Sequence, residues 1–329
     1  LVGPHFGCVM TELSAKSSGN PSLNEQSEEN FADNEGWISW RTLTTEAMGR
    51  FYEQLLANVS TSPGLVGYEA AERARAANGT FAWSWGAAAE IQETINTINS
   101  WGMHLHDWCA WNAVVESFET DNDKGQVMHH FVHPLAFFCM HQPSAVSDRL
   151  MLLTETLLHQ ANCLVEAGYV DRLDQDCLRP GQGLRRSDRR KQVMRLGHRW
   201  TRFNRFLATL DAINDSAYRK LSRNFRDLSV HSFAPRFMDG QIMRAIRSIE
   251  PWQEIVKQPG GGYTLADHPT KKCVSYTMGV LEPFPLRDAC SASLSEYQKV
   301  EAAMSAFSEL LEEVCDCMDA IPDRLSEQS

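Results

Sequence analysis

Residues 297–321 read YQKVEAAMSAFSELLEEVCDCMDAI, and the spacing of their apolar side chains decides the fold class. Large apolar residues recur at alternating steps of three and four, which places them on one face of an α-helix. The stripe consists of Tyr297, Val300, Met304, Phe307, Leu311, Val314, Met318 and Ile321. The pattern predicts a helix from about residue 285 to 321 that buries this seam against other helices.

A second seam precedes it, over residues 192–231. Apolar side chains again follow steps of three and four, and arginines line a neighbouring face. We expect one long helix that ends near His231, because Pro235 prevents continuation. The seam consists of Val193, Leu196, Trp200, Phe203, Leu207, Leu210, Ala217 and Leu221. Since this helix is basic and the C-terminal helix is rich in Glu and Asp, the two are expected to pack as an antiparallel pair.

The rest of the chain also has mostly helical periodicity, so the predicted class is all-α: a helical bundle with long seam helices. Residues 1–36 hold few large apolar side chains and are expected to be disordered. Residues 37–143 form an N-terminal helical region with a break at ANGT (77–80), a separate helix over 104–119 and a turn at TDNDKG (120–125). Residues 144–329 form the bundle, with Ser144 as the N-cap of a helix that stops near Gly168. A small β-hairpin is inserted at about 253–281.

Composition and cysteine content indicate in which compartment the protein is expected. The chain has 329 residues, 43% of them hydrophobic, and nine cysteines without a C-x-x-C pair. No secretory signal is visible, and the most apolar run, FVHPLAFFCM (131–140), is too short to cross a bilayer. Scattered single cysteines are typical of reduced thiols, so we expect a cytoplasmic protein that does not use a membrane.

Charge is distributed unevenly. The net charge is −11, yet residues 179–247 hold seventeen Lys and Arg against five Asp and Glu, a local +12 against −23 elsewhere. Such a segment can bind a polyanion such as RNA, or pair with acidic helices of the same protein, and charge alone favours neither. The candidate RNA contacts are Arg185, Arg186, Arg189, Arg190, Arg195, Arg199, Arg202 and Arg223.

The basic segment ends in RDLSVHSF, residues 226–233. A histidine is suited to proton transfer near neutral pH, and an arginine offers a fixed cationic fork for phosphate oxygens. Asp227 lies four residues before His231 and can orient its ring. Arg226 and His231 are five apart, and therefore point about 140° away from each other on an unbroken helix. They can act together only if the helix unwinds before His231 or if a second subunit completes the site.

This stretch resembles the motif of the HEPN superfamily, in which Arg and a polar residue precede a His, and its HepT-like form has an aromatic two residues later. The resemblance implies a helical bundle, a homodimer with two motifs at one cleft, and metal-independent RNA cleavage by a toxin or antiphage protein with a cognate inhibitor. Catalytic roles would fall to Arg226, Asp227 and His231, with no cofactor. HepT-like motifs usually carry Tyr where Phe233 stands, so modification of that hydroxyl is not expected.

Two other functions stay open. The same residues suit a non-catalytic all-α protein that binds a partner or a nucleotide, with Arg223, Asp227 and His231 forming an ion-pair ladder on a helix surface. A third possibility is a metal-dependent phosphohydrolase of the HD type, centred on His104, His106 and Asp107, which are of ligand type but lack regular spacing.

Overall fold

A computed structural model describes residues 23–57, 63–169, 184–237 and 240–321, with side chains from residue 36 onward. Two units divide the chain, residues 1–49 and residues 50–329. The described helices are α1 (Leu23–Ala57), α2 (Glu69–Ala76), α3 (Phe81–Ser117), α4 (Asp121–Val127), the π-helical turn η2 (Met128–Val132), α5 (His133–Val165), α6 (Arg186–Gly197), α7 (Phe203–Ala212), α8 (Ser216–Leu221), α9 (Phe225–His231) and α10 (Leu286–Asp319). The strands are β1 (Ile242–Lys257) and β2 (Tyr263–Leu281), so the predicted all-α bundle with an inserted hairpin is confirmed.

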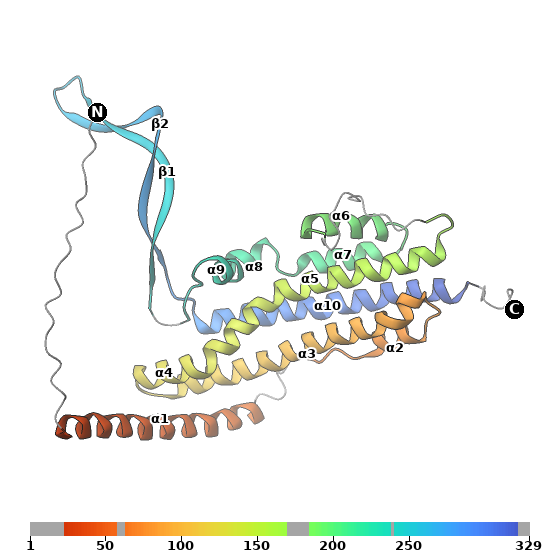
Figure 1. Cartoon of the computed structure of the whole chain (residues 1–329), viewed down its shortest axis with the longest axis horizontal. Coiled ribbons are helices and arrows are strands. Elements are labelled where there is room, and N and C mark those ends of the chain that lie inside the picture. The colour runs from red at the N-terminus through yellow and green to blue at the C-terminus, as the bar shows by residue number, and fades with distance from the viewer. Residues whose placement is uncertain (1–22, 58–62, 170–183, 238–239, 322–329) are drawn as a thin grey trace. The chain divides into compact units, whose positions relative to one another are not determined.

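The long helices α3, α5 and α10 lie side by side and form the centre of the bundle, as Figure 1 shows. Helix α6 packs on α5, and helix α7 packs on α10. The largest fully buried side chains include Trp83, Trp101, Trp108, Phe206, Tyr297 and Phe307. Rings from different helices meet in this core, for example Phe206 of α7 and Phe307 of α10, whose centroids are 5.8 Å apart. Burial of these large side chains is the main force that holds the helices together.

The predicted C-terminal seam is confirmed by α10. All its seam residues from Tyr297 to Met318 are buried. The expected contact between an acidic and a basic helix also occurs. Glu313 of α10 accepts hydrogen bonds from the backbone N–H groups of Thr201 and Arg202, at 2.7 and 2.9 Å, in the turn that leads into α7. A carboxylate there satisfies N–H groups that a helix start leaves without partners.

The single helix predicted over residues 192–231 is wrong, because the structure breaks it into α6, α7, α8 and α9. The first break follows Gly197, which packs against Phe203. The second has Asn214 in the left-handed region, with φ 52°, and Asp215 as the N-cap of α8. The third follows from two successive left-handed residues, Arg223 and Asn224. The apolar seam remains largely buried across the first break, so its periodicity could not reveal the turns.

Three other local predictions are corrected. Helix α1 already begins at Leu23, so disorder does not hold for residues 23–36, since extending a formed helix costs little; residues 1–22 lie outside the described residues. The segments 81–99 and 104–117 form one helix, α3, and TDNDKG begins α4, capped by Thr120. Ser144 is not an N-cap, because α5 continues through Pro143 and the expected boundary at 143/144.

The hairpin is longer than predicted. Strand β1 begins at Ile242, ahead of the expected start at 253, and pairs with β2 in antiparallel register from Ile242↔Leu281 to Lys257↔Tyr263. The turn at QPGGG is as predicted, with Gly261 at φ 88°, a conformation that favours glycine. Many large apolar side chains of the hairpin strands are exposed, such as Ile249 and Tyr276. Among the described residues, no helix has both the length and the apolar character that a membrane crossing requires.

Candidate functional site

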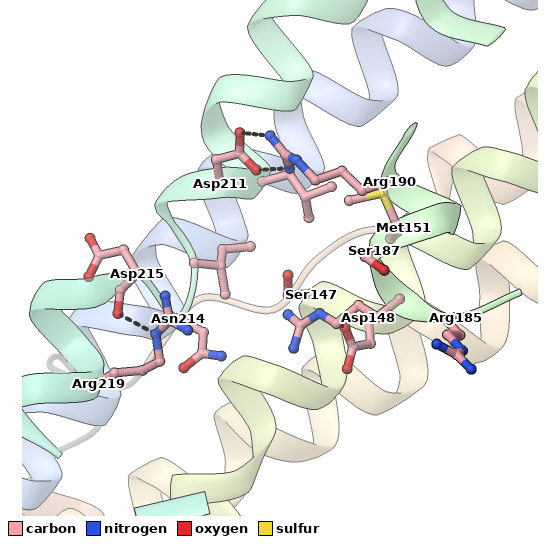
Figure 2. Close-up of a pocket in the computed structure, with 13 residues that line it drawn as sticks. Ser147, Asp148, Met151, Arg185, Ser187, Arg190, Asp211, Asn214, Asp215 and Arg219 are labelled. Atoms are coloured by element: carbon pink, nitrogen blue, oxygen red, sulfur yellow. Dashed lines mark hydrogen bonds and ion pairs between the residues drawn. The ribbon is translucent and has the colours of Figure 1, made fainter. Parts of the chain in front are cut away.

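A polar cleft of about 620 Å³ opens between α5, α6, α7 and α8. Its lining residues come from four helices and the turn between α7 and α8, and Figure 2 shows their side chains around the cleft. Helix α5 contributes Ser147, Asp148 and Met151; the start of α6 contributes Arg185, Arg186, Ser187 and Arg190; α7, α8 and the turn between them contribute Leu210, Asp211, Ile213, Asn214, Asp215 and Arg219. The cleft exists because the basic segment is broken into short helices that can turn around it.

The floor of the cleft is apolar. Leu210 and Ile213 are 1% and 4% exposed, and Met151 is also buried. Polar and charged groups stand around this floor, including the side-chain amide of Asn214 (Figure 2). An apolar floor with a few polar groups around it is the usual construction of a small-molecule site.

Two of the four arginines at the cleft are neutralised by carboxylates. Arg186 pairs with Asp148 at 2.8 Å. Arg190 holds Asp211 in a two-pronged contact in which one N–O distance is 2.6 Å. The hydrogen bond with Asp211 raises the pKa of Arg190 above its ordinary value. These two pairs fix the walls of the cleft and leave little charge for a ligand.

The other two arginines keep their charge available. Arg219 donates through Nε to the backbone carbonyl of Asp215, at 3.3 Å (Figure 2), and no carboxylate among the described residues pairs with its guanidinium group. Arg185 is exposed at the start of α6, and among the described residues no carboxylate pairs with it. The Asp215 carboxylate is itself opposed by Lys299, 3.4 Å away. Arg185 and Arg219 are therefore the groups that can bind an anion here.

The turn between α7 and α8 is held by the central helix α10. The backbone N–H of Asn214 donates to the carboxylate of Glu296 at 2.6 Å, and Lys299 donates to the same carboxylate at 2.5 Å. Glu296 is only 1% exposed. Asp215 caps α8 by accepting from the Tyr218 N–H at 2.7 Å, a bond that lowers the pKa of its carboxyl. This network sets the position of Arg219.

A small hollow of about 40 Å³ adjoins the cleft and shares Arg186, Asn214 and Arg219 with it. Arg226 and Asp227 of the predicted catalytic motif line this hollow. The motif therefore lies next to the cleft, at the start of α9.

The geometry within the motif differs from the expectation. Helix α9 continues to His231, so Arg226 and His231 lie on one unbroken helix and their side chains diverge by about 140°. Asp227 accepts a hydrogen bond from Arg226 at 2.9 Å, and no contact joins it to His231 among the described residues. His231 and its neighbour Ser232 are exposed. Within one chain, the three residues do not form the expected site.

Most of the remaining candidate RNA contacts bind acceptors of the same chain. Arg189 pairs with Glu155 at 2.9 Å, Arg199 with Glu166 at 3.4 Å, and Arg202 with Glu309 at 3.2 Å. Arg195 donates to the Gln192 side chain at 2.8 Å, and Arg223 donates to the backbone carbonyl of Glu282 at 2.7 Å. The alternative of internal pairing with acidic side chains therefore describes Arg189, Arg199 and Arg202.

The candidate metal ligands His104, His106 and Asp107 form no metal cluster in the part of the chain that the structure describes. On α3, His104 contacts the backbone carbonyl of Ser100 through Nδ1 at 2.6 Å. The Nε2 atom of His106 is buried without a hydrogen-bond partner among the described residues. Burial raises the pKa of the Asp107 carboxyl. All three residues are half-buried on α3.

Sequence analysis missed Asn214, Asp215 and Arg219, although they are central to the cleft. The signal was present as IND (213–215), because Asn tolerates the left-handed region and Asp is a good N-cap. The apolar steps on either side of residues 213–215 favour a continuous helix and hide this signal of a break. Comparisons with protein-family models, curated proteins and solved structures gave no match for this chain.

Proposed function

We propose that the cleft between α5, α6, α7 and α8 binds a phosphate-bearing nucleotide. The observation that carries this proposal is the pair of arginines, Arg185 and Arg219, that stand at the cleft without a carboxylate partner among the described residues. An arginine guanidinium can bind phosphate oxygens through two parallel hydrogen bonds.

The rest of the cleft suits the other parts of a nucleotide. Its volume of about 620 Å³ lies within the usual range for small-molecule sites. Leu210 and Ile213 contribute apolar atoms to the floor of the cleft, and the Asn214 amide both donates and accepts hydrogen bonds. The proposal corresponds to the nucleotide-binding alternative rather than to a long RNA track, because the arginines beyond the cleft are engaged within the chain.

Binding is tested by fluorescence anisotropy with labelled ATP and GTP, with unlabelled inorganic triphosphate as competitor. A hydrogen bond to a charged group contributes about 1.5–3 kcal/mol, so Arg219→Gln should weaken binding by about 10- to 150-fold. Arg185→Gln should act in the same direction. The matched control is Arg75→Gln, an exposed arginine on α2, which should leave binding unchanged. Equal affinity of the wild type and both cleft variants, or no binding of either nucleotide, contradicts the proposal.

A second candidate function is metal-independent RNA cleavage of the HEPN type. It is favoured by the position of Arg226 in the hollow that adjoins the cleft. Because α9 is unbroken, His231 would have to come from a second copy of the chain, with Arg226 on the scissile phosphate and His231 as acid and base. Asp227 would then hold Arg226 rather than orient His231.

A mixing experiment tests cleavage and dimerisation together. Arg226→Gln and His231→Ala should each abolish EDTA-resistant cleavage of a labelled single-stranded RNA. When the two inactive proteins are unfolded together and refolded as a mixture, mixed dimers regain one intact site, so activity should return in part. If both variants cleave RNA as fast as the wild type, this function is rejected. If the mixture of the two inactive variants recovers no activity, the shared site is rejected.

The homodimer, a cognate inhibitor and a cytoplasmic location remain proposals. The hairpin supports an interaction role, because a two-stranded sheet with many exposed large apolar side chains is marginal without a partner surface. Ile249 of β1 and Met278 of β2 are 68% and 66% exposed. The partner-binding alternative predicts neither nucleotide affinity nor RNA cleavage, so the two experiments above also separate it from the other functions.

A further inference from the structure

Two cysteines from distant parts of the chain are in contact in the bundle. The Sγ atoms of Cys109 and Cys290 are 3.0 Å apart, although the residues are separated by 181 positions in the sequence. Cys109 lies on α3, and Cys290 lies near the beginning of α10. The contact therefore joins two of the three central helices directly.

The pair is neither fully hidden nor freely exposed. Cys290 is buried at 4% exposure, whereas Cys109 is half-buried. The thiol of Cys139, on α5, is also buried close by and interacts electrostatically with both. Cys109 is thus the sulfur of this group that an oxidant meets first.

The contact also makes the two thiols unequal. The hydrogen bond between the two thiols lowers the pKa of Cys109, although burial acts in the opposite direction. The same contact, together with burial, raises the pKa of Cys290. Since the thiolate is the reactive form of cysteine, Cys109 is the nucleophile and Cys290 the thiol that resolves the first product.

We propose that Cys109 and Cys290 form a reversible disulfide when the protein meets a peroxide. In the first step the Cys109 sulfur attacks one oxygen of hydrogen peroxide, the O–O bond breaks, and hydroxide leaves. In the second step the Cys290 sulfur attacks the resulting sulfenic acid, the S–O bond breaks, and a second hydroxide leaves. The Cys109 and Cys290 protons convert both hydroxides to water, so two thiols are oxidised and one peroxide is reduced.

The required movement is small. A disulfide has an S–S length of 2.03–2.05 Å, so the sulfurs must approach by about 1 Å. The bond would fasten α3 to the beginning of α10 and close a very long loop, which constrains the unfolded chain strongly. We therefore expect the oxidised protein to melt at a higher temperature than the reduced protein, and a dithiol reductant to reverse the shift.

The test is peptide mapping of the full chain after treatment with hydrogen peroxide, without reduction. The expected result is a linked peptide pair that contains Cys109 and Cys290, with the mass loss of two hydrogens, and its loss after dithiothreitol. Cys109→Ser and Cys290→Ser should each remove this species and the rise in melting temperature. The matched control Cys317→Ser changes an exposed cysteine of α10 and should leave both unchanged.

The wild-type map alone decides the proposal if a serine variant fails to fold. A map in which Cys109 stays reduced, or pairs with Cys139 rather than Cys290, would overturn it. So would a linkage of Cys109 or Cys290 to Cys8 or Cys177, which lie outside the described residues. Nucleotide binding plays no part in this readout, so its failure would leave this result unaffected.

Discussion

Glu296 is the residue on which the candidate cleft most depends without lining it. Its carboxylate on α10 accepts from the Asn214 backbone N–H at 2.6 Å and from Lys299 at 2.5 Å, and its side chain is 1% exposed. We predict that Glu296→Ala both destabilises the fold and weakens nucleotide binding. The turn between α7 and α8 would lose its anchor, and Arg219 would lose its fixed position with it.

The magnitude follows from the two bonds. Removing one partner of a buried charged pair typically costs about 3–5 kcal/mol, because the remaining charge stays in a poorly solvated place. Lys299 keeps Asp215 as a second partner, 3.4 Å away, which favours the lower part of that range. At about 2–4 °C for each kcal/mol, the melting temperature should fall by roughly 6–12 °C. Glu296→Gln keeps an acceptor for Asn214 and should cost less than Glu296→Ala.

The assay combines thermal unfolding by circular dichroism with the nucleotide titration. The control is Asp288→Asn on the same helix, an exposed position whose carboxylate pairs with no side chain among the described residues, where a change of less than about 1 kcal/mol is expected. Equal melting temperatures for Glu296→Ala and Asp288→Asn would refute the role of the buried carboxylate. A strongly destabilised Glu296→Ala that binds nucleotide with wild-type affinity when folded would refute the link to Arg219.

Two further predictions concern stability. The hydrogen bond from the Tyr218 N–H lowers the pKa of Asp215 below its ordinary 3.8, so the stability that the ionised carboxylate confers is present above that pH and is lost as the pH falls through the folded pKa. The variant Asp215→Ala should therefore be less stable than the wild type by about 1 kcal/mol at pH 7, and this difference should vanish in acid. A difference in melting temperature that stays constant with pH would contradict this. Gly197→Ala would place Cβ 2.3 Å from the Phe203 ring and should cost about 1–3 kcal/mol. Gly125→Ala has no neighbour within 4 Å and should be neutral or stabilising, so equal shifts of the two alanine variants in thermal unfolding would count against the packing argument.

The fold class could be predicted from sequence because the apolar periodicity of α10 is regular along most of the helix. Its seam keeps steps of three and four from Tyr297 to Met318, and every one of those residues is buried. The hairpin turn was equally legible, since QPGGG provides the glycine that a left-handed φ requires. Both features depend on local chemistry alone. The extent of the strands was not predictable in the same way, because the exposed apolar residues of β1 do not alternate with polar ones as in a half-buried strand.

The broken helix over residues 186–231 shows where the sequence argument stops. The apolar residues on both sides of Gly197 remain buried, so their periodicity continues through a turn that ends the helix. At Asn214 the decisive contact is with Glu296, 82 residues away. Long-range hydrogen bonds of this kind are tertiary information, and local propensity can only indicate where a break would be tolerated.

The charge of the basic segment shows why counting residues was a poor guide to function. The local excess of +12 fits both RNA binding and pairing within the chain, and in the structure most arginines of α6 and α7 meet carboxylates from α5, α7 and α10. Arg185 and Arg219 differ from these arginines, because Arg185 is the N-cap of α6, Arg219 lies on the short helix α8, and no carboxylate among the described residues pairs with either guanidinium group. The break at Asn214 therefore bears on both the failed helix prediction and the cleft, because it starts the short helix that brings Arg219 to the cleft.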